Sequence, residues 1–153
     1  MTDGLDTAIE ARLSALIDRL SPTSRATLAR SLAGQLRRTQ SARIAAQKNP
    51  DGSAFEPRKP QLRHRKKDLR APMFKKLRTN TYLKAKGTAD GAVVAFSREV
   101  ERIARVHQLG LRDRVSRRGT LEADYPARQL LGLTAIEEAL LYTLISNHLA
   151  DAL

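Results

Sequence analysis

Residues 81–97, TYLKAKGTADGAVVAFS, carry the clearest β-strand pattern of the chain and decide its fold class. Apolar and polar side chains alternate through the first half of this stretch, as they do in a half-buried strand. Asp90-Gly91 is a frequent connection in β-hairpins, because both residues tolerate the backbone angles of a tight turn. We therefore expect strands near 81–86 and 92–97, joined by a turn at 88–91.

Helical periodicity dominates the chain before this hairpin. Apolar residues recur at helical spacing over residues 5–20 and again over 22–47. Ser21 can cap the second helix, and Pro22 fits its first turn, where a missing N–H costs nothing. The stretch NPDG at 49–52 then breaks the pattern. Residues 5–48 are therefore predicted to form a helical hairpin.

The chain after the β-hairpin is predicted to be mostly helical. A short helix is expected over 98–110, with Gly110 as its end. Thr134 and Glu137 form a capping box that opens a strongly apolar helix over 134–149. We also expect a short helix at 71–79, before the hairpin, and a loop or strand edge at 111–125.

These elements predict an α+β fold with an N-terminal helical hairpin, a small antiparallel sheet built around a β-hairpin, and a C-terminal amphipathic helix. The length of 153 residues fits a single domain over 1–153. Its parts are the helical hairpin at 5–48, a basic extended segment at 49–72, and the hairpin, short helix, loop and last helix at 73–153. With three Tyr, three Phe and no Trp, the core is expected to consist of Leu, Ile, Val and Ala.

Positive charge is concentrated in one segment. The formal net charge is +12, and residues 58–78 hold ten basic residues and one acidic residue, which leaves only +3 for the rest of the chain. The ten are Arg58, Lys59, Arg63, Arg65, Lys66, Lys67, Arg70, Lys75, Lys76 and Arg78. They could neutralise the phosphates of nucleic acid or bind acidic protein partners within an assembly. No aromatic residue lies between 58 and 70, so there is no stacking platform for single strands. No zinc finger or RNP motif is present either, which argues against sequence-specific recognition.

Several functional classes lack their sequence signals. There is no cysteine, which excludes disulfides and thiolate chemistry and fits a reducing compartment. The acidic start is unlike a signal peptide, and no apolar run approaches the roughly 20 residues of a membrane span, so a protein made in the cytoplasm is expected. Glycine-rich phosphate loops, serine nucleophile elbows and zinc-ligand patterns are also missing. We therefore expect no enzymatic activity, no catalytic residue, no metal and no cofactor.

Three motifs in a fixed order give the chain a family resemblance. They are RIAAQKNPDGSAFEPRK at 43–59, IARVHQLG at 103–110 and YPARQLLG at 125–132. Together with the basic stretch and the helices between them, they resemble the phage virion morphogenesis, or tail completion, family of contractile-tailed temperate phages. The resemblance covers about residues 5–150.

The resemblance implies a structural role in the tail of a virion. A member of the family would act as a tail terminator or neck protein, which caps the head-proximal end of the tail as a ring and makes it competent for head joining. The six-fold symmetry of such tails implies a homo-hexameric ring whose partners are the tail tube, the sheath and the head–tail connector. The alternative function is that of a non-specific nucleic-acid-binding basic protein.

Two groups of residues are candidates for these contacts. The basic segment would face either the DNA in the channel or neighbouring tail proteins, and protein is favoured because a strongly cationic lumen would slow DNA exit. The second group either shapes the local backbone, by ending a helix or fixing a turn, or forms part of a subunit interface. It consists of His107, Gln108, Gly110, Pro126, Ala127 and Arg128. In the interface alternative, His107 and Arg128 would form hydrogen bonds between subunits.

Overall fold

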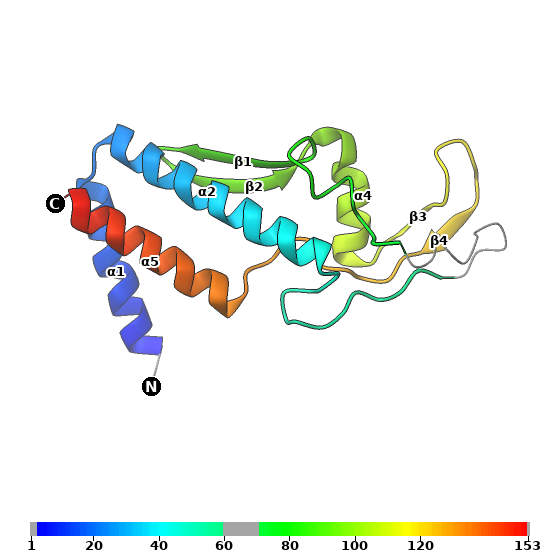
Figure 1. Ribbon diagram of the computed structural model, residues 1–153, viewed down its shortest axis with the longest axis horizontal. Helices are drawn as coiled ribbons and strands as arrows, with labels where there is room; N and C mark the ends of the chain where they lie inside the picture. The colour runs from blue at the N-terminus through cyan, green and yellow to red at the C-terminus, as the bar shows by residue number, and fades with distance from the viewer. Residues whose placement is uncertain (1–2, 60–70, 153) are drawn as a thin grey trace. The chain divides into compact units, whose positions relative to one another are not determined.

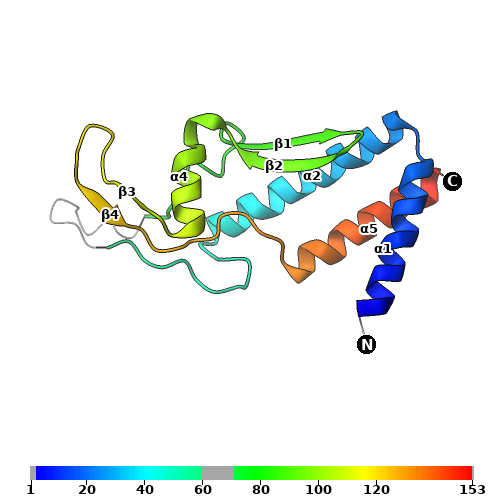
Figure 2. The same cartoon turned by 180° about the vertical axis from the view of Figure 1, so that it is seen from behind.

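The computed structural model describes residues 3–59 and 71–152. Within these ranges, four α-helices and two antiparallel two-stranded sheets follow one another along the chain (Figures 1 and 2), which confirms the predicted α+β class. The helices are α1 (Asp3–Arg19), α2 (Pro22–Ala45), α4 (Arg98–Leu109) and α5 (Ala135–Ala152). The strands are β1 (Leu83–Thr88), β2 (Gly91–Phe96), β3 (Arg112–Arg114) and β4 (Glu122–Asp124).

The ends of the helices follow the predicted signals within a few residues. Helix α2 ends two residues before Gln47, whose φ of 58° is incompatible with a right-handed helix. Helix α4 ends at Gly110, which adopts the left-handed conformation with φ 65°. Thr134 immediately precedes α5, at the position expected of a cap.

The short helix predicted at 71–79 is wrong. Residues 73–78 form consecutive turns instead. Phe74 has a φ of 62°, and a residue in that conformation cannot continue a right-handed helix. In addition, the Gln47 side chain forms hydrogen bonds with both the N–H and the C=O of Met73. A contact from a distant residue therefore overrides the local apolar spacing.

The region at 111–125, expected to be a loop or strand edge, forms a second small hairpin. Strands β3 and β4 pair in antiparallel register, with Arg112 opposite Asp124 and Arg114 opposite Glu122. Arg112 Nε also lies 3.1 Å from a carboxylate oxygen of Glu122. Opposite charges facing each other across two strands stabilise the pairing. The complementary charges are visible in the sequences RDR and EAD, but strands of three residues are too short to show a clear β pattern.

The chain divides into two compact units built from interleaved segments. The first unit comprises Met1–Leu36, Ala85–Val94 and Ala135–Leu153, and the second comprises Arg37–Lys84 and Ala95–Thr134. Helix α2 and both strands of the first hairpin contribute residues to each unit. The single domain predicted over 1–153 stays a prediction.

The first unit packs helices against the tip of the β1–β2 hairpin. Leu28, Ala29 and Ala33 of α2 are buried, and the hairpin tip runs beside α2 in both views (Figures 1 and 2). The approach is closest at Gly87, where an added Cβ atom would lie 2.2 Å from the backbone nitrogen of Arg30. His148 of α5 binds Ser24 of α2, with Nε2 2.9 Å from Oγ. Only glycine at position 87 allows the backbone of β1 to come this close to the backbone of α2 at Arg30.

The second unit has a mainly aliphatic core with phenylalanines packed in and against it. Its buried cluster contains Ile44, Phe55, Met73, Ala104 and Leu130, against which Phe74, Leu77 and Phe96 pack. All three phenylalanines of the chain therefore lie in or against this cluster. Most of the buried apolar residues of this unit are Leu, Ile, Val or Ala, as expected, and the phenylalanines add an aromatic cluster at one place.

Gly87 provides a test of the packing in the first unit. We expect Gly87→Ala to lower the free energy of unfolding by about 1–3 kcal/mol, because the new methyl group overlaps with the α2 backbone. Thermal unfolding of the purified protein measures the loss. Gly91→Ala in the same hairpin is the control, since an added Cβ there meets nothing within 4 Å. Equal stability of the two variants would contradict the packing.

Candidate functional site

Side-chain amides hold the loops of the second unit in place. Gln47 accepts a hydrogen bond from the Met73 N–H (2.7 Å) and donates one to the Met73 carbonyl (3.0 Å). Gln108 makes the same pair of contacts with Leu131, at 2.9 Å each. A third amide, Gln40, is only 5% exposed and donates to the Gly132 carbonyl at 3.0 Å. These amides take the place of a neighbouring strand for backbone groups that would otherwise be unpaired.

Arg128 is a buried cation held by neutral acceptors. Its side chain is 4% exposed, and Nε donates to the Glu56 carbonyl at 2.6 Å while NH2 donates to the Pro57 carbonyl at 3.0 Å. The Arg128 backbone N–H also donates to the carbonyl of His107 at 2.6 Å. Burial is the main cause that lowers the pKa of Arg128 from its ordinary value, with the charge of Arg58 acting in the same direction.

His107 is held in one protonation state by the same arginine. Arg128 NH1 lies 3.2 Å from His107 Nδ1, and because a guanidinium can only donate, Nδ1 must be the acceptor. The ring is therefore neutral, with its proton on Nε2. Burial, together with the nearby charge of Arg128, lowers the pKa of His107 from 6.5 to about 4.

A row of edge-to-face ring contacts passes through His107. Phe55 contacts Phe74 with ring centroids 5.8 Å apart, Phe74 contacts His107 at 4.8 Å, and His107 contacts Tyr125 at 5.1 Å. Such contacts add to the stabilisation that comes from burial. They align three loops and α4 around one point.

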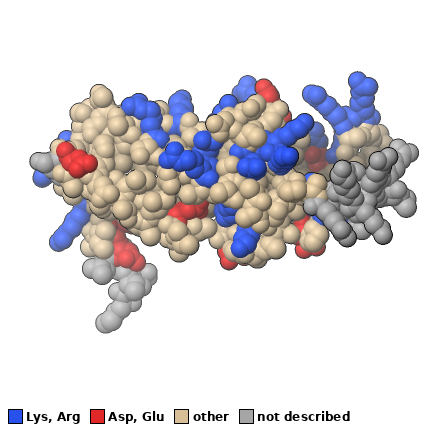
Figure 3. All heavy atoms as spheres, viewed as in Figure 1, with Lys and Arg blue, Asp and Glu red and all other residues tan. Residues whose placement is uncertain are grey.

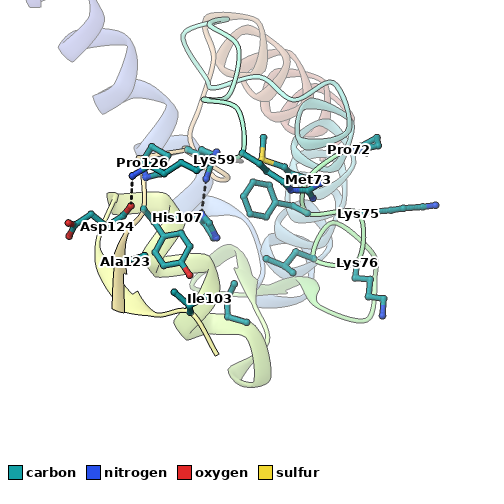
Figure 4. A pocket seen from close by; sticks show the side chains of 16 residues that line it. Lys59, Pro72, Met73, Lys75, Lys76, Ile103, His107, Ala123, Asp124 and Pro126 are labelled. Carbon is teal, nitrogen blue, oxygen red and sulfur yellow. Dashed lines mark hydrogen bonds between the residues drawn. The ribbon is translucent and has the colours of Figure 1, made fainter. Parts of the chain in front are cut away.

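A pocket of about 730 Å³ opens beside this row (Figure 4). Its apolar lining includes Met73, Phe74, Leu77, Ile103 and Tyr125. Around it lie the cationic residues Arg58, Lys59, Lys75, Lys76 and Arg128, with Asp124 as the acidic residue of the lining. The labelled side chains of Lys75 and Lys76 extend away from the rings in Figure 4. The pocket thus combines an apolar interior with a basic rim, which suits binding more than bond-making chemistry.

The basic segment is only partly placed. Arg58, Lys59, Lys75 and Lys76 are exposed, and Arg78 is half-buried. Arg58 donates to the Ala71 carbonyl at 2.9 Å, and Lys59 lies 3.4 Å from the carbonyl oxygen of Asp124. The predicted contacts that lie outside the described residues are Arg63, Arg65, Lys66, Lys67 and Arg70. Figure 3 shows Lys and Arg side chains spread over the face in view, with fewer Asp and Glu between them.

The two short motifs singled out in the sequence meet in the second unit. His107 and Arg128 are hydrogen-bonded to each other, and an added Cβ atom at Gly110 would lie 2.8 Å from the backbone nitrogen of Ala127. Pro126 lines the pocket beside Arg128. The contacts among these residues lie within one chain, and a further role in a subunit interface stays a prediction.

Sequence reasoning missed other residues that build this site. The amides of Gln40 and Gln47 gave no signal, because nothing in the sequence distinguishes a glutamine that binds the backbone from one on the surface. Phe74 was expected in a short helix at 71–79 and Tyr125 in a loop or strand edge at 111–125, and neither was assigned to a site. The sequence held one usable signal, since Tyr125 is the first residue of the YPARQLLG motif.

Two kinds of feature are absent from residues 3–59 and 71–152. No helix there is long and apolar enough to cross a bilayer. No group of three or more His, Cys, Asp or Glu residues is placed to hold a metal ion.

Comparisons with known proteins agree with the motifs. The model of the phage virion morphogenesis family matches residues 5–150. Tail completion protein S of Escherichia phage P2 is 38% identical to this chain over 142 residues, which cover 92% of the chain and 94% of that relative. No solved structure matches the chain.

Arg128 is expected to be the most sensitive position of the second unit. Arg128→Lys keeps the charge but cannot reproduce the three side-chain hydrogen bonds, so we expect a loss of about 2–4 kcal/mol in the free energy of unfolding. Chemical denaturation measures it. Arg117→Lys, at an exposed position, is the matched control and should stay within about 0.5 kcal/mol of the wild type. A variant at position 128 as stable as this control would refute the assigned role.

The buried neutral His107 predicts a pH dependence of stability. The unfolded chain takes up a proton near pH 6.5, whereas the folded chain does so only near pH 4. Between these values the unfolded state binds more protons, so the free energy of unfolding should fall as the pH drops from about 6.5 to about 4. Denaturation at several pH values should show a weaker slope for His107→Gln than for His148→Gln. An unchanged slope in His107→Gln would rule out this origin.

Proposed function

This chain belongs to the phage virion morphogenesis family, and we propose that it is a structural tail completion protein that caps the head-proximal end of a contractile tail as a ring. The observation that carries the proposal is the 38% identity to a tail completion protein over almost the whole length of both chains. The family match over residues 5–150 also includes segments of both units. The protein would then be a component of the virion tail and not an enzyme.

The surface of the chain supports a role in assembly. Large apolar side chains are exposed in both units, among them Ile136 at 82% and Leu121 at 71%. Further examples are Val93, Ile103, Leu109 and Tyr142. Such residues favour assembly where they lie side by side, because contiguous apolar patches mark surfaces that partners cover. A homo-hexameric ring that contacts the tail tube, the sheath and the head–tail connector would cover them.

The basic residues would serve such a ring through contacts with acidic surfaces. We favour neighbouring tail or connector proteins as their targets over the DNA of the channel, because strong attachment of DNA to the lumen would slow its exit. The alternative function, non-specific nucleic-acid binding, depends on the same cations. Half of the ten lie outside the described residues, so that alternative stays a hypothesis without a geometric argument of its own.

Deletion of the gene in its phage tests the proposed function. Without this protein, filled heads and separate tails should accumulate in the lysate, and joined particles should fall by at least tenfold. Electron microscopy counts of the three species measure the effect. Expression of the wild-type chain from a plasmid is the control and should restore joined particles. A deletion that leaves the count of joined particles unchanged would exclude a tail completion role.

A further inference from the structure

The pocket of the second unit has the composition of a protein-binding surface. Met, Phe, Tyr and Arg side chains line it, and these residue types are enriched at the centres of protein interfaces. Ile103 lies at its edge and is 48% exposed. The volume of about 730 Å³ is sufficient for several apolar side chains of a partner. The cations around it select a partner segment that also carries acidic residues.

The N-terminal half of α1 has the complementary composition. Every residue from 6 to 12 is exposed, and Ile9 is 44% exposed. At about 100° per residue, Asp6, Ile9, Glu10 and Leu13 fall within an arc of about 100° on one side of the helix. This part of α1 projects past α5 in both views (Figures 1 and 2). An apolar ridge flanked by two carboxylates is thus available to a partner.

We propose that the exposed half of α1 of one subunit binds in the pocket of a neighbouring subunit. In this arrangement Ile9 and Leu13 enter the apolar interior, and Asp6 and Glu10 approach Lys75 and Lys76. The argument rests on charge complementarity and on two exposed apolar surfaces, one on the pocket and one on the helix. The proposal rests on the ring proposed above and specifies a contact between its subunits.

The contact is of the head-to-tail kind. Its two surfaces differ, since one is a helix of the first unit and the other is a pocket of the second. Each subunit therefore offers one helix and one pocket, and a chain of such contacts closes into a ring when the rotation between subunits allows it. A symmetric dimer through a single shared patch would not use both surfaces in this way.

Cross-linking between two single-cysteine variants tests the contact. The chain contains no cysteine, so Ile9→Cys and Ile103→Cys each introduce the sole thiol of their protein. A mixture of the two, treated with a short bifunctional maleimide, should give a covalent dimer at least ten times more abundant than a mixture of Ile9→Cys and Val93→Cys. Val93 is exposed and lies outside both surfaces. The reaction is run on purified protein over a range of concentrations and on assembled particles.

The double variant I9C/I103C distinguishes the possible occupants of the pocket. A ladder of covalent oligomers supports the proposal, and its last band gives the number of subunits in the ring. A bond formed within one monomer would overturn it, because the helix would then occupy the pocket of its own chain. Absence of the cross-link in both purified protein and particles would also overturn it and would leave the pocket to another tail protein.

Charge reversal supplies a second measurement that does not depend on thiol geometry. K75E/K76E should weaken self-association by at least tenfold in sedimentation experiments, as should D6K/E10K. Mixing the two variants should restore the association, because both contacts between unlike subunits are complementary. In one contact the unchanged acidic helix meets the unchanged basic pocket, and in the other the reversed helix meets the reversed pocket. Failure of this rescue would count against the contact. Normal head joining by either charge variant would contradict the proposed contact. The tail completion role would be unaffected by that result, because gene deletion tests it separately.

Discussion

The second unit depends on a single buried guanidinium. Arg128 binds the carbonyls of Glu56 and Pro57 and fixes the ring of His107, while its own backbone N–H binds the His107 carbonyl. A cation in this environment is stable only while its acceptors remain in place. The 56–57 segment, the end of α4 and the 126–128 segment are thus held together by the requirement to solvate one charge. The aromatic row and the pocket beside it are arranged around this point.

Ordered loops in this protein do not need a sheet. Three glutamine side chains, Gln40, Gln47 and Gln108, bind backbone groups of Gly132, Met73 and Leu131. An amide offers a donor and an acceptor with the same spacing as a peptide group, so it can replace a strand neighbour. The second unit can therefore contain irregular segments, because the glutamine side chains satisfy backbone groups that have no strand neighbour.

Much of the fold could be predicted because its signals are local. The helices and the first hairpin follow from periodicity, from Pro22 and from Asp90-Gly91, all of which act within a few residues. The turns at 73–78 could not be predicted. Phe74 adopts the left-handed conformation there, and the Gln47 side chain binds the Met73 backbone from 26 positions away in the sequence. The site was reached in part. The motifs around His107 and Arg128 were noticed separately, and nothing in the sequence indicated that they meet or that the aromatic residues gather there.

The interleaving of the two units has a consequence for inheritance. Both units draw on α2 and on the β1–β2 hairpin, and the chain passes from one unit to the other after Leu36, Lys84, Val94 and Thr134. A recombination crossover inside this gene would join segments of one unit that were selected in different ancestors. Neither unit is a contiguous module that could be replaced by itself. The gene is therefore expected to pass between genomes whole, with its packing partners inherited together.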